Sequence, residues 1–318
     1  MQQGIAVLFP GQGSQRIGML AAAADEYPQI RETFAEASDA LGEDLWALVA
    51  EGAESELNLT ENTQPAMLAA SVALWRCWRD GGGAQPSGMA GHSLGELTAL
   101  CCAGALAFAD AVRLVRMRGR FMQNAVPAGE GAMTAILGLP SEEVATLCAE
   151  LSGNGEGLVA AVNFNSPQQV VIAGHTAAVQ RAGERLREAG ARRVMALPVS
   201  APFHTELMRP AGERLREMLD DLDLQPPQVP VIHNVTAAAE SDPPRIRELL
   251  VEQVAAPVRW TDCVLALRDA GARCFLECGP GKVLGGLLRR IDRSLDCHYL
   301  EAPQDLRRAL AACTGDAA

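Results

Sequence analysis

The chain has 318 residues, of which 48% are hydrophobic and 21% charged, and its formal net charge is −12. This composition is typical of a folded globular protein and excludes a disordered or fibrous chain. The acidic balance argues against nucleic acid and anionic membrane surfaces as partners, and no apolar run is long enough to cross a bilayer. We expect one large core or two unequal ones.

The N-terminus and the cysteines favour a cytoplasmic location. An apolar run over residues 5–9 stops at Pro10 and follows no basic stretch, which argues against a secretory signal. The nine cysteines are scattered and odd in number, which is typical of reduced thiols. Because the chain has no C-x-x-C or H-x-x-x-H pairing, we expect no metal site. Cys274 and Cys278 lie in an apolar, strand-like run, and we interpret them as core thiols.

The first part of the chain alternates between strand and helix patterns. A buried strand over residues 5–9 enters a glycine-rich turn, and helical patterns follow over 32–41, 45–51 and 64–80. Pro65 falls in the first turn of the last of these helices, where proline is tolerated. A short strand at residues 89–90 comes next, and helices over 96–103 and 108–126 complete this part.

Residues 130–199 follow a different pattern. It predicts a strand over 132–139, a helix over 141–151, a hairpin of 158–165 and 168–173, a helix over 176–189 and a strand over 193–199. This β-α-β-β-α-β order is that of the ferredoxin-like unit. We therefore predict a small inserted ferredoxin-like subdomain over residues 129–200.

The last part returns to alternation. It predicts helices over 205–222, 246–255 and 283–293, and strands over 229–234 and 274–277. Such alternation indicates a mostly parallel sheet with helices on both faces. The predicted fold is α/β: a hydrolase-like core over residues 1–128 and 201–318 carries the inserted subdomain, and the site lies in the cleft between them.

The segment Gly91-His92-Ser93-Leu94-Gly95 matches the G-x-S-x-G nucleophile elbow, in which a serine stands between a strand and a helix. The glycines permit a tight turn and close approach of neighbouring elements. The first amides of the helix then favour a developing oxyanion. We predict that Ser93 is a nucleophile.

A serine needs a base within hydrogen-bond reach. Among the five histidines, His204 lies where the insert returns to the core, and junctions between domains form clefts. We predict His204 as the base; the alternative is a helix-capping polar residue. His175 and His298 are interpreted as surface residues, and His233 as a hydrogen-bonded core residue.

Six segments together resemble the malonyl-CoA:acyl-carrier-protein transacylase family, and specifically its stand-alone bacterial fatty-acid synthesis type. They occur in the family's order and spacing from about residue 5 to residue 292. The segments are Phe9-Pro10-Gly11-Gln12-Gly13-Ser14-Gln15, Gly91-His92-Ser93-Leu94-Gly95-Glu96, Met117-Arg118-Gly119, Asn163-Phe164-Asn165-Ser166-Pro167, Pro202-Phe203-His204 and Glu277-Cys278-Gly279-Pro280-Gly281.

The resemblance implies roles for the residues that carry the chemistry. Ser93 would be the nucleophile and His204 the general acid and base. Gln12 and the backbone amide of Leu94 would form the oxyanion hole; the alternative for Gln12 is a turn residue with a solvated amide. The backbone carbonyl of Gln253 would orient the histidine.

The resemblance also implies how substrates bind. Arg118 would grip the free carboxylate of malonate, a role that suits the planar, always charged guanidinium. Asn163 and Asn165 match positions near the pantetheine arm. Phe203 would narrow the pocket at the α-carbon of the acyl group, and Met122 is the next candidate for that role.

The substrates implied are malonyl-CoA and an acyl carrier protein that brings its own phosphopantetheine, with no further cofactor and a monomeric enzyme. The carrier is acidic in this family, so docking onto a chain of net charge −12 needs a local basic patch. Two arginine groups are candidates: Arg289, Arg290 and Arg293 near the C-terminus, and Arg185, Arg187, Arg192 and Arg193 in the insert.

Other charged residues have plainer interpretations. Arg113, Arg116 and Arg120, which share a predicted helix with Arg118, are interpreted as a solvated face. Glu96 is interpreted as a first-turn acid favoured by the helix dipole.

Two other functions compete with the transferase. A serine esterase or thioesterase shares the elbow and would have its acid between serine and histidine in chain order, where many Asp and Glu lie. A non-catalytic scaffold would need neither the serine nor the histidine. Release of thiol from malonyl-CoA would distinguish an enzyme from a scaffold. A hydrolase would then release malonate to water, whereas a transferase would place malonyl on the carrier. Fatty-acid, polyketide and malonate-decarboxylation machinery all stay open as destinations.

Overall fold

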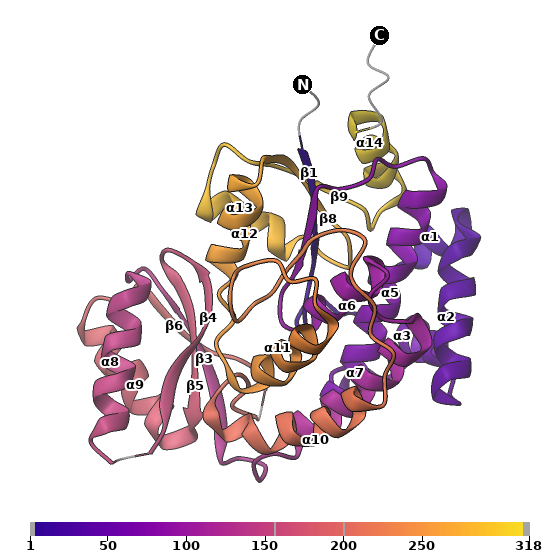
Figure 1. Ribbon diagram of the computed structural model, residues 1–318. Coiled ribbons are helices and arrows are strands. Elements are labelled where there is room, and N and C mark those ends of the chain that lie inside the picture. Colours follow the sequence, from indigo (N-terminus) through magenta and orange to yellow (C-terminus); the bar gives the residue numbers. More distant parts are fainter. Residues whose placement is uncertain (1–3, 156, 200, 314–318) are drawn as a thin grey trace.

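The computed structural model describes residues 4–155, 157–199 and 201–313 (Figure 1). It contains two sheets. Sheet A has the order β7-β2-β1-β8-β9, and all its neighbouring strands are parallel. The strands are β1 (Gly4–Phe9), β2 (Gly88–Gly91), β7 (Val231–Ile232), β8 (Ala272–Glu277) and β9 (Asp296–Tyr299).

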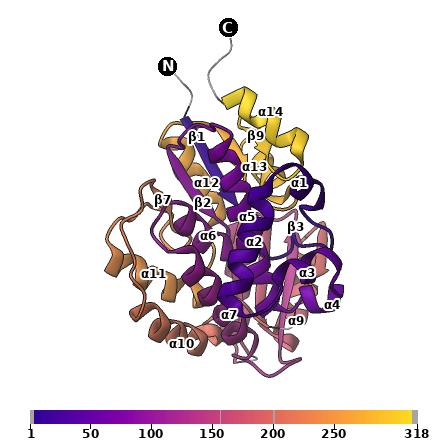
Figure 2. The ribbon, with the colours of Figure 1, turned by 90° about the vertical axis from the view of Figure 1, so that its right-hand side faces the viewer.

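Sheet A is buried on both faces because helices cover each of them, as expected for a parallel sheet. Along β1, Val7 and Phe9 point into one core cluster, whereas Ala6 and Leu8 point into the other. The larger cluster is covered mainly by α1 (Ala21–Glu26), α2 (Pro28–Leu41), α3 (Leu45–Glu51), α4 (Glu54–Leu57), α5 (Thr60–Asp80), α6 (Leu94–Cys102), α7 (Phe108–Gln123), α10 (Arg209–Asp220), α11 (Pro243–Ala255) and α14 (Pro303–Cys313). The smaller is covered by α12 (Trp260–Asp269) and α13 (Val283–Ile291). In Figure 2, α2 and α5 lie on the viewer's side of the molecule.

Sheet B is antiparallel, with the order β4-β5-β3-β6. Its strands are β3 (Gly131–Leu137), β4 (Val159–Ser166), β5 (Gln169–His175) and β6 (Arg193–Ala196), and its helices are α8 (Ser141–Gly153) and α9 (Thr176–Glu188). Both helices lie on the outer face of the sheet and share a third core cluster with it (Figure 1). This is the ferredoxin-like order, so the predicted fold class is confirmed. The division at residues 128/129 and 200/201 stays a prediction.

Two predicted helices have different boundaries in the structure. α5 begins at Thr60, four residues earlier than predicted, and in its first turn the hydroxyl of Thr63 donates to the carbonyls of Leu57 and Leu59. Pro65 therefore lies inside the helix, where it removes one backbone hydrogen bond. The helix predicted over 205–222 divides into a 3₁₀ turn (Glu206–Met208) and α10, since Pro210 favours the first turn of a new helix.

Several residues have surroundings other than the predicted ones. Arg116 is buried, because Asn62 accepts from its guanidinium and Glu43 pairs with it, so its assignment to a solvated face is wrong. His175 and His298 are half-buried rather than fully at the surface. Within the described residues, no helix is both long and apolar enough to span a membrane.

Candidate active site

Ser93 stands in a strained turn between β2 and α6. Its backbone has φ 52°, which is unusual for a residue with a side chain. A Cβ at Gly91 would lie 1.8 Å from the carbonyl carbon of Gly95, and one at Gly95 would lie 2.1 Å from the carbonyl oxygen of Phe9. Both glycines are therefore required for this turn, which presents the serine at the start of α6.

His204 lies between Ser93 and the backbone of α11. Its Nε2 is 2.7 Å from the Oγ of Ser93, and its Nδ1 is 2.9 Å from the carbonyl oxygen of Gln253. A carbonyl only accepts, so the neutral ring carries its proton on Nδ1, and Nε2 accepts from the serine hydroxyl. The partner of the histidine is thus a backbone carbonyl, whereas a serine hydrolase of the α/β-hydrolase type would have a carboxylate there.

The surroundings of His204 keep it uncharged. The side chain is 4% exposed, and burial together with the nearby charge of Arg118 lowers its pKa to about 3. A histidine with so low a pKa is neutral at pH 7 and can accept a proton.

Arg118 is a buried cation beside the serine. It is 1% exposed on α7, and burial lowers its pKa to about 10, which leaves it charged at neutral pH. Its Nη1 donates to Gln64 Oε1 (3.0 Å), and its Nη2 donates to Gln253 Oε1 (2.8 Å) and Ser93 Oγ (3.2 Å). These acceptors are neutral, and within the described part of the chain Nε has no hydrogen-bond partner.

Glu96 organises the base of the site and is fully buried, which its interpretation as a first-turn acid did not predict. Its carboxylate lies 2.7 Å from His233 Nδ1 and accepts from the backbone N–H of Asn234 (2.9 Å) and from Gln253 Nε2 (2.8 Å). His233 is thereby confirmed as a hydrogen-bonded core residue.

Asn234 and Gln253 connect Glu96 to the backbone of Ser93. The Oδ1 of Asn234 accepts from the backbone N–H of Ser93 (2.8 Å), and its Nδ2 donates to the carbonyl of Gly91 (2.7 Å). Gln253 Nε2 donates to the carbonyl of Ser93 (3.0 Å). The roles of Gln64 and Asn234 were not predicted from the sequence; the one signal for Asn234 is the polar pair His233-Asn234 at the end of an apolar strand.

A pocket of about 110 Å³ opens onto Ser93 between the two sheets. It is lined by Gln12, Gln64, His92, Ser93, Leu94, Arg118, Met122, Met133, Asn163, Leu197, Val199, Phe203 and His204. Met133 and Asn163 come from sheet B, so the pocket lies between the core and the predicted insert.

The predicted binding residues differ in their surroundings. Gln12 is half-buried, and its Nε2 donates to Thr60 Oγ1 at 3.4 Å. Asn163 faces the pocket, and its Oδ1 is buried without a hydrogen-bond partner among the described residues. Asn165 is buried, and its Oδ1 lies 2.8 Å from Nε2 of His92, so its side chain orients that ring.

Replacing Glu96 by Leu should lower the free energy of unfolding by at least about 3 kcal/mol, because three buried donors lose their acceptor at about 1–3 kcal/mol each. Glu61→Leu is the control, since this half-exposed carboxylate pairs with Arg120 and should contribute less than about 1 kcal/mol. Urea unfolding measures both variants. Equal losses would contradict the organising role of Glu96.

Comparisons with known proteins agree on one family. The family model for the acyl transferase domain matches residues 7–297. The malonyl CoA-acyl carrier protein transacylase of Salmonella typhimurium is 54% identical over 305 residues, which cover 96% of this chain and 98% of that protein. The protein of the same name from Bacillus subtilis is 45% identical over 306 residues, 96% of each chain.

Solved structures give the same result. The malonyl CoA-acyl carrier protein transacylase of Coxiella burnetii superposes with a TM-score of 0.96 at 45% identity, covering 99% of both chains. A malonyl-transacylase in complex with its type II PKS acyl-carrier protein superposes with a TM-score of 0.95 at 50% identity, covering 97% of this chain and 99% of that one. The chain belongs to the acyl transferase domain family and, within it, to the malonyl CoA-acyl carrier protein transacylases.

Proposed function

We propose that this protein transfers a malonyl group from coenzyme A to the phosphopantetheine thiol of an acyl carrier protein, through an ester on Ser93. Membership of the transacylase family supports this function. The observation that carries the mechanism is the alignment of Ser93 Oγ with His204 Nε2 at 2.7 Å, beside the buried guanidinium of Arg118. A nucleophile, a neutral base and a fixed positive charge thus meet in one small pocket.

In the first half-reaction, Ser93 Oγ attacks the thioester carbonyl while its proton passes to His204 Nε2. The carbonyl π electrons move onto oxygen, and the resulting oxyanion lies near the amide of Leu94, the first residue of α6. Gln12 completes the oxyanion site. The carbon–sulfur bond then breaks, and His204 returns the proton to the leaving thiolate of coenzyme A. The carbonyl of Gln253 stabilises the transient imidazolium.

Arg118 selects the acyl group. A charged carboxylate enters a buried pocket only at high cost unless it is paired. The guanidinium offers a fork of donors, and its Nε has no partner among the described residues. The free carboxylate of malonate supplies the counter-ion that the neutral amides of Gln64 and Gln253 do not.

In the second half-reaction, the carrier thiol attacks the seryl ester, and His204 takes the thiol proton and gives it to Ser93 Oγ as the ester breaks. The carrier brings its own phosphopantetheine, so we propose that no further cofactor is needed. The Oδ1 of Asn163, which has no hydrogen-bond partner among the residues that the structure describes, suits an amide N–H of the pantetheine arm. Asn165 acts on the arm through His92.

The carrier docks on an arginine-rich pocket of about 570 Å³ between α13 and sheet B. Five arginines line it, drawn from both predicted groups: Arg192, Arg193, Arg289, Arg290 and Arg293. Arg185 and Arg187 make local contacts instead, with Glu188 and the carbonyl of Val194. A concentrated positive pocket on an acidic protein steers an acidic partner to one place.

We further propose that the enzyme acts as a monomer in the cytoplasm. All nine cysteines are free thiols, which suits a reducing compartment.

Ser93→Ala removes the nucleophile while leaving the pocket in place. Wild-type protein mixed with malonyl-CoA should gain the mass of one malonyl group, and the variant should gain none. Intact-protein mass spectrometry makes the measurement. A covalent adduct that persists in the variant would overturn the assignment, and malonate released to water at the rate of carrier loading would favour a hydrolase.

Arg118→Ala should lower kcat/KM for malonyl-CoA. The activation free energy should rise by roughly 3–5 kcal/mol, by analogy with breaking a buried charge pair. Acetyl-CoA has no free carboxylate and should be far less affected. The control is Arg120→Ala on the same helix, where the side chain is exposed and pairs with Glu61. Equal losses for both substrates would show that Arg118 is structural.

Phe203→Ser should widen the pocket at the α-carbon of the acyl group, which Phe203 and Met122 both line. Attraction for one methylene is worth only about 1–3 kcal/mol, so exclusion of methylmalonyl requires a clash. The ratio of methylmalonyl to malonyl kcat/KM should rise at least about tenfold, or about 1.4 kcal/mol. An unchanged ratio would indicate that Met122, rather than Phe203, excludes the methylmalonyl group.

Reversing the charges of Arg289 and Arg290 to Glu should raise the apparent KM for the carrier and leave acylation by malonyl-CoA unchanged. The defect should shrink as salt screens the field. Arg185→Glu with Arg187→Glu is the control, because these residues have local partners on α9 and β6. If acylation and carrier transfer fell together, the docking proposal would fail.

A further inference from the structure

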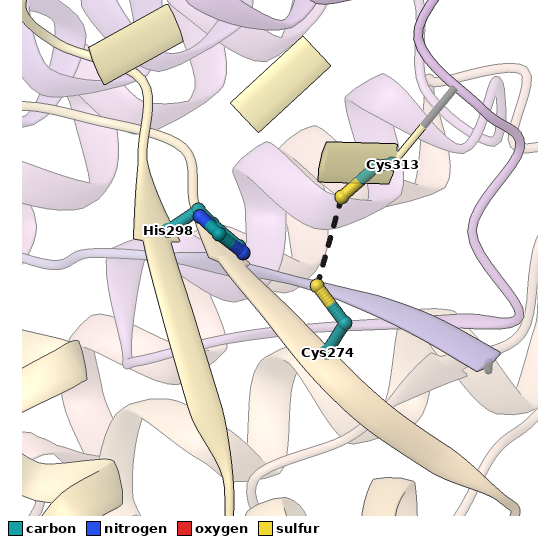
Figure 3. A group of neighbouring side chains, drawn as sticks. All are labelled: Cys274, His298 and Cys313. Atoms are coloured by element: carbon teal, nitrogen blue, oxygen red, sulfur yellow. Dashed lines mark hydrogen bonds between the residues drawn. The ribbon is translucent and has the colours of Figure 1, made fainter. Parts of the chain in front are cut away.

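Two cysteines and a histidine meet at one end of sheet A, remote from the pocket. Cys274 lies on β8, His298 on β9, and Cys313 at the end of α14. Their ligand atoms all lie within 4.8 Å of one another, and the two sulfurs are 3.6 Å apart. Figure 3 shows the imidazole of His298 reaching from its strand toward both sulfurs.

The fold holds these three side chains close together. β8 and β9 are parallel, with Leu276 opposite His298, so the pleat places Cys274 and His298 on the same face of sheet A. That face is the one on which α14 packs, because the helix contributes Leu306 and Cys313 to the larger core cluster. The three side chains are thus held by strand register and helix packing.

The donor set is that of a thiophilic metal ion. Zinc binds thiolate sulfur at about 2.3 Å and imidazole nitrogen at about 2.0 Å, so two sulfurs of a tetrahedral site lie about 3.8 Å apart. The observed 3.6 Å is close to that separation. Three protein ligands leave the fourth position for water.

We propose that Cys274, His298 and Cys313 form a Zn²⁺ site with one coordination position open to solvent. Binding forms two zinc–thiolate bonds and one zinc–imidazole bond, and the two thiol protons pass to solvent. Cys274 and His298 are half-buried, so the ion can enter from outside.

Such an ion would attach α14 to sheet A without touching the chemistry. Cys274 pairs with Ile5 at the start of β1, whereas Ser93 follows the far end of β2. The site therefore lies at the opposite end of the sheet from the nucleophile. A bound ion should raise the thermal unfolding midpoint, because it binds the folded chain and not the separated ligands.

Titration of the full, phosphine-reduced chain with Co²⁺ tests the proposal, with Zn²⁺ then competing against a chromophoric chelator. We expect one ion per chain, with thiolate-to-cobalt charge-transfer absorption. Cys274→Ser, Cys313→Ser and His298→Ala should each lower the Zn²⁺ affinity at least about tenfold. Acylation by malonyl-CoA, unchanged in all three, verifies that the variants fold.

Cys297→Ser is the matched control. Cys297 neighbours His298 on β9, but it packs against the core cluster on the opposite face. This variant should bind Zn²⁺ as the wild type does. The proposal is overturned if the wild type lacks the charge-transfer absorption, if the three ligand variants keep wild-type affinity, or if Cys297→Ser loses as much as they do. The wild-type spectrum decides alone should a variant not fold.

Discussion

The buried guanidinium of Arg118 is the constraint to which the rest of the site is fitted. A charge that is 1% exposed must be surrounded by oxygen acceptors, and Gln64, Gln253 and Ser93 provide them. These acceptors are neutral, and the buried carboxylate of Glu96 reaches Arg118 only through the side chain of Gln253, so the positive charge is only partly offset and acts on its neighbours. It helps to hold His204 neutral, and in the proposed function it also pairs with the carboxylate that the substrate brings. Under the proposed function, specificity for the monothioester of a dicarboxylic acid and the protonation state of His204 thus share one physical cause.

The proposed reacting groups also depend on backbone conformations that do not persist without support from their surroundings. Ser93 and His204 both have positive φ, at 52° and 63°. Such conformations cost about 1–3 kcal/mol each and need surroundings that enforce them. At Ser93 the enforcement is polar: Glu96 fixes Asn234 and Gln253, which bind the amide and the carbonyl of the serine. Ser93 Oγ therefore lies at hydrogen-bond distance from His204 Nε2 without a substrate, and in the proposed reaction this alignment lowers the barrier.

The sequence allowed the architecture to be predicted because strand and helix periods are local. The alternation in the core and the β-α-β-β-α-β order of the insert each follow from runs of fewer than twenty residues. The motif around Ser93 is local as well. The features that were not predicted depend on partners far away in the chain. Arg116 is buried because it hydrogen-bonds to Asn62 and pairs with Glu43, and Glu96 organises the site because His233 lies beside it. Cys274, His298 and Cys313 come from three separate elements, so no spacing in the sequence predicts that they lie together.

The central claim is that burial and the charge of Arg118 keep His204 neutral, so that it acts as a base throughout the physiological range. The pH dependence of kcat/KM for acylation of Ser93, followed as coenzyme A release between pH 8 and pH 5, tests this most directly, since it reports the ionisation of the free enzyme. The deprotonated histidine is the active form, and its pKa is lowered to about 3, so the rate should stay level over this range and fall only in stronger acid. A rate that falls below an apparent pKa of about 6.5, the ordinary value for histidine, would contradict the account.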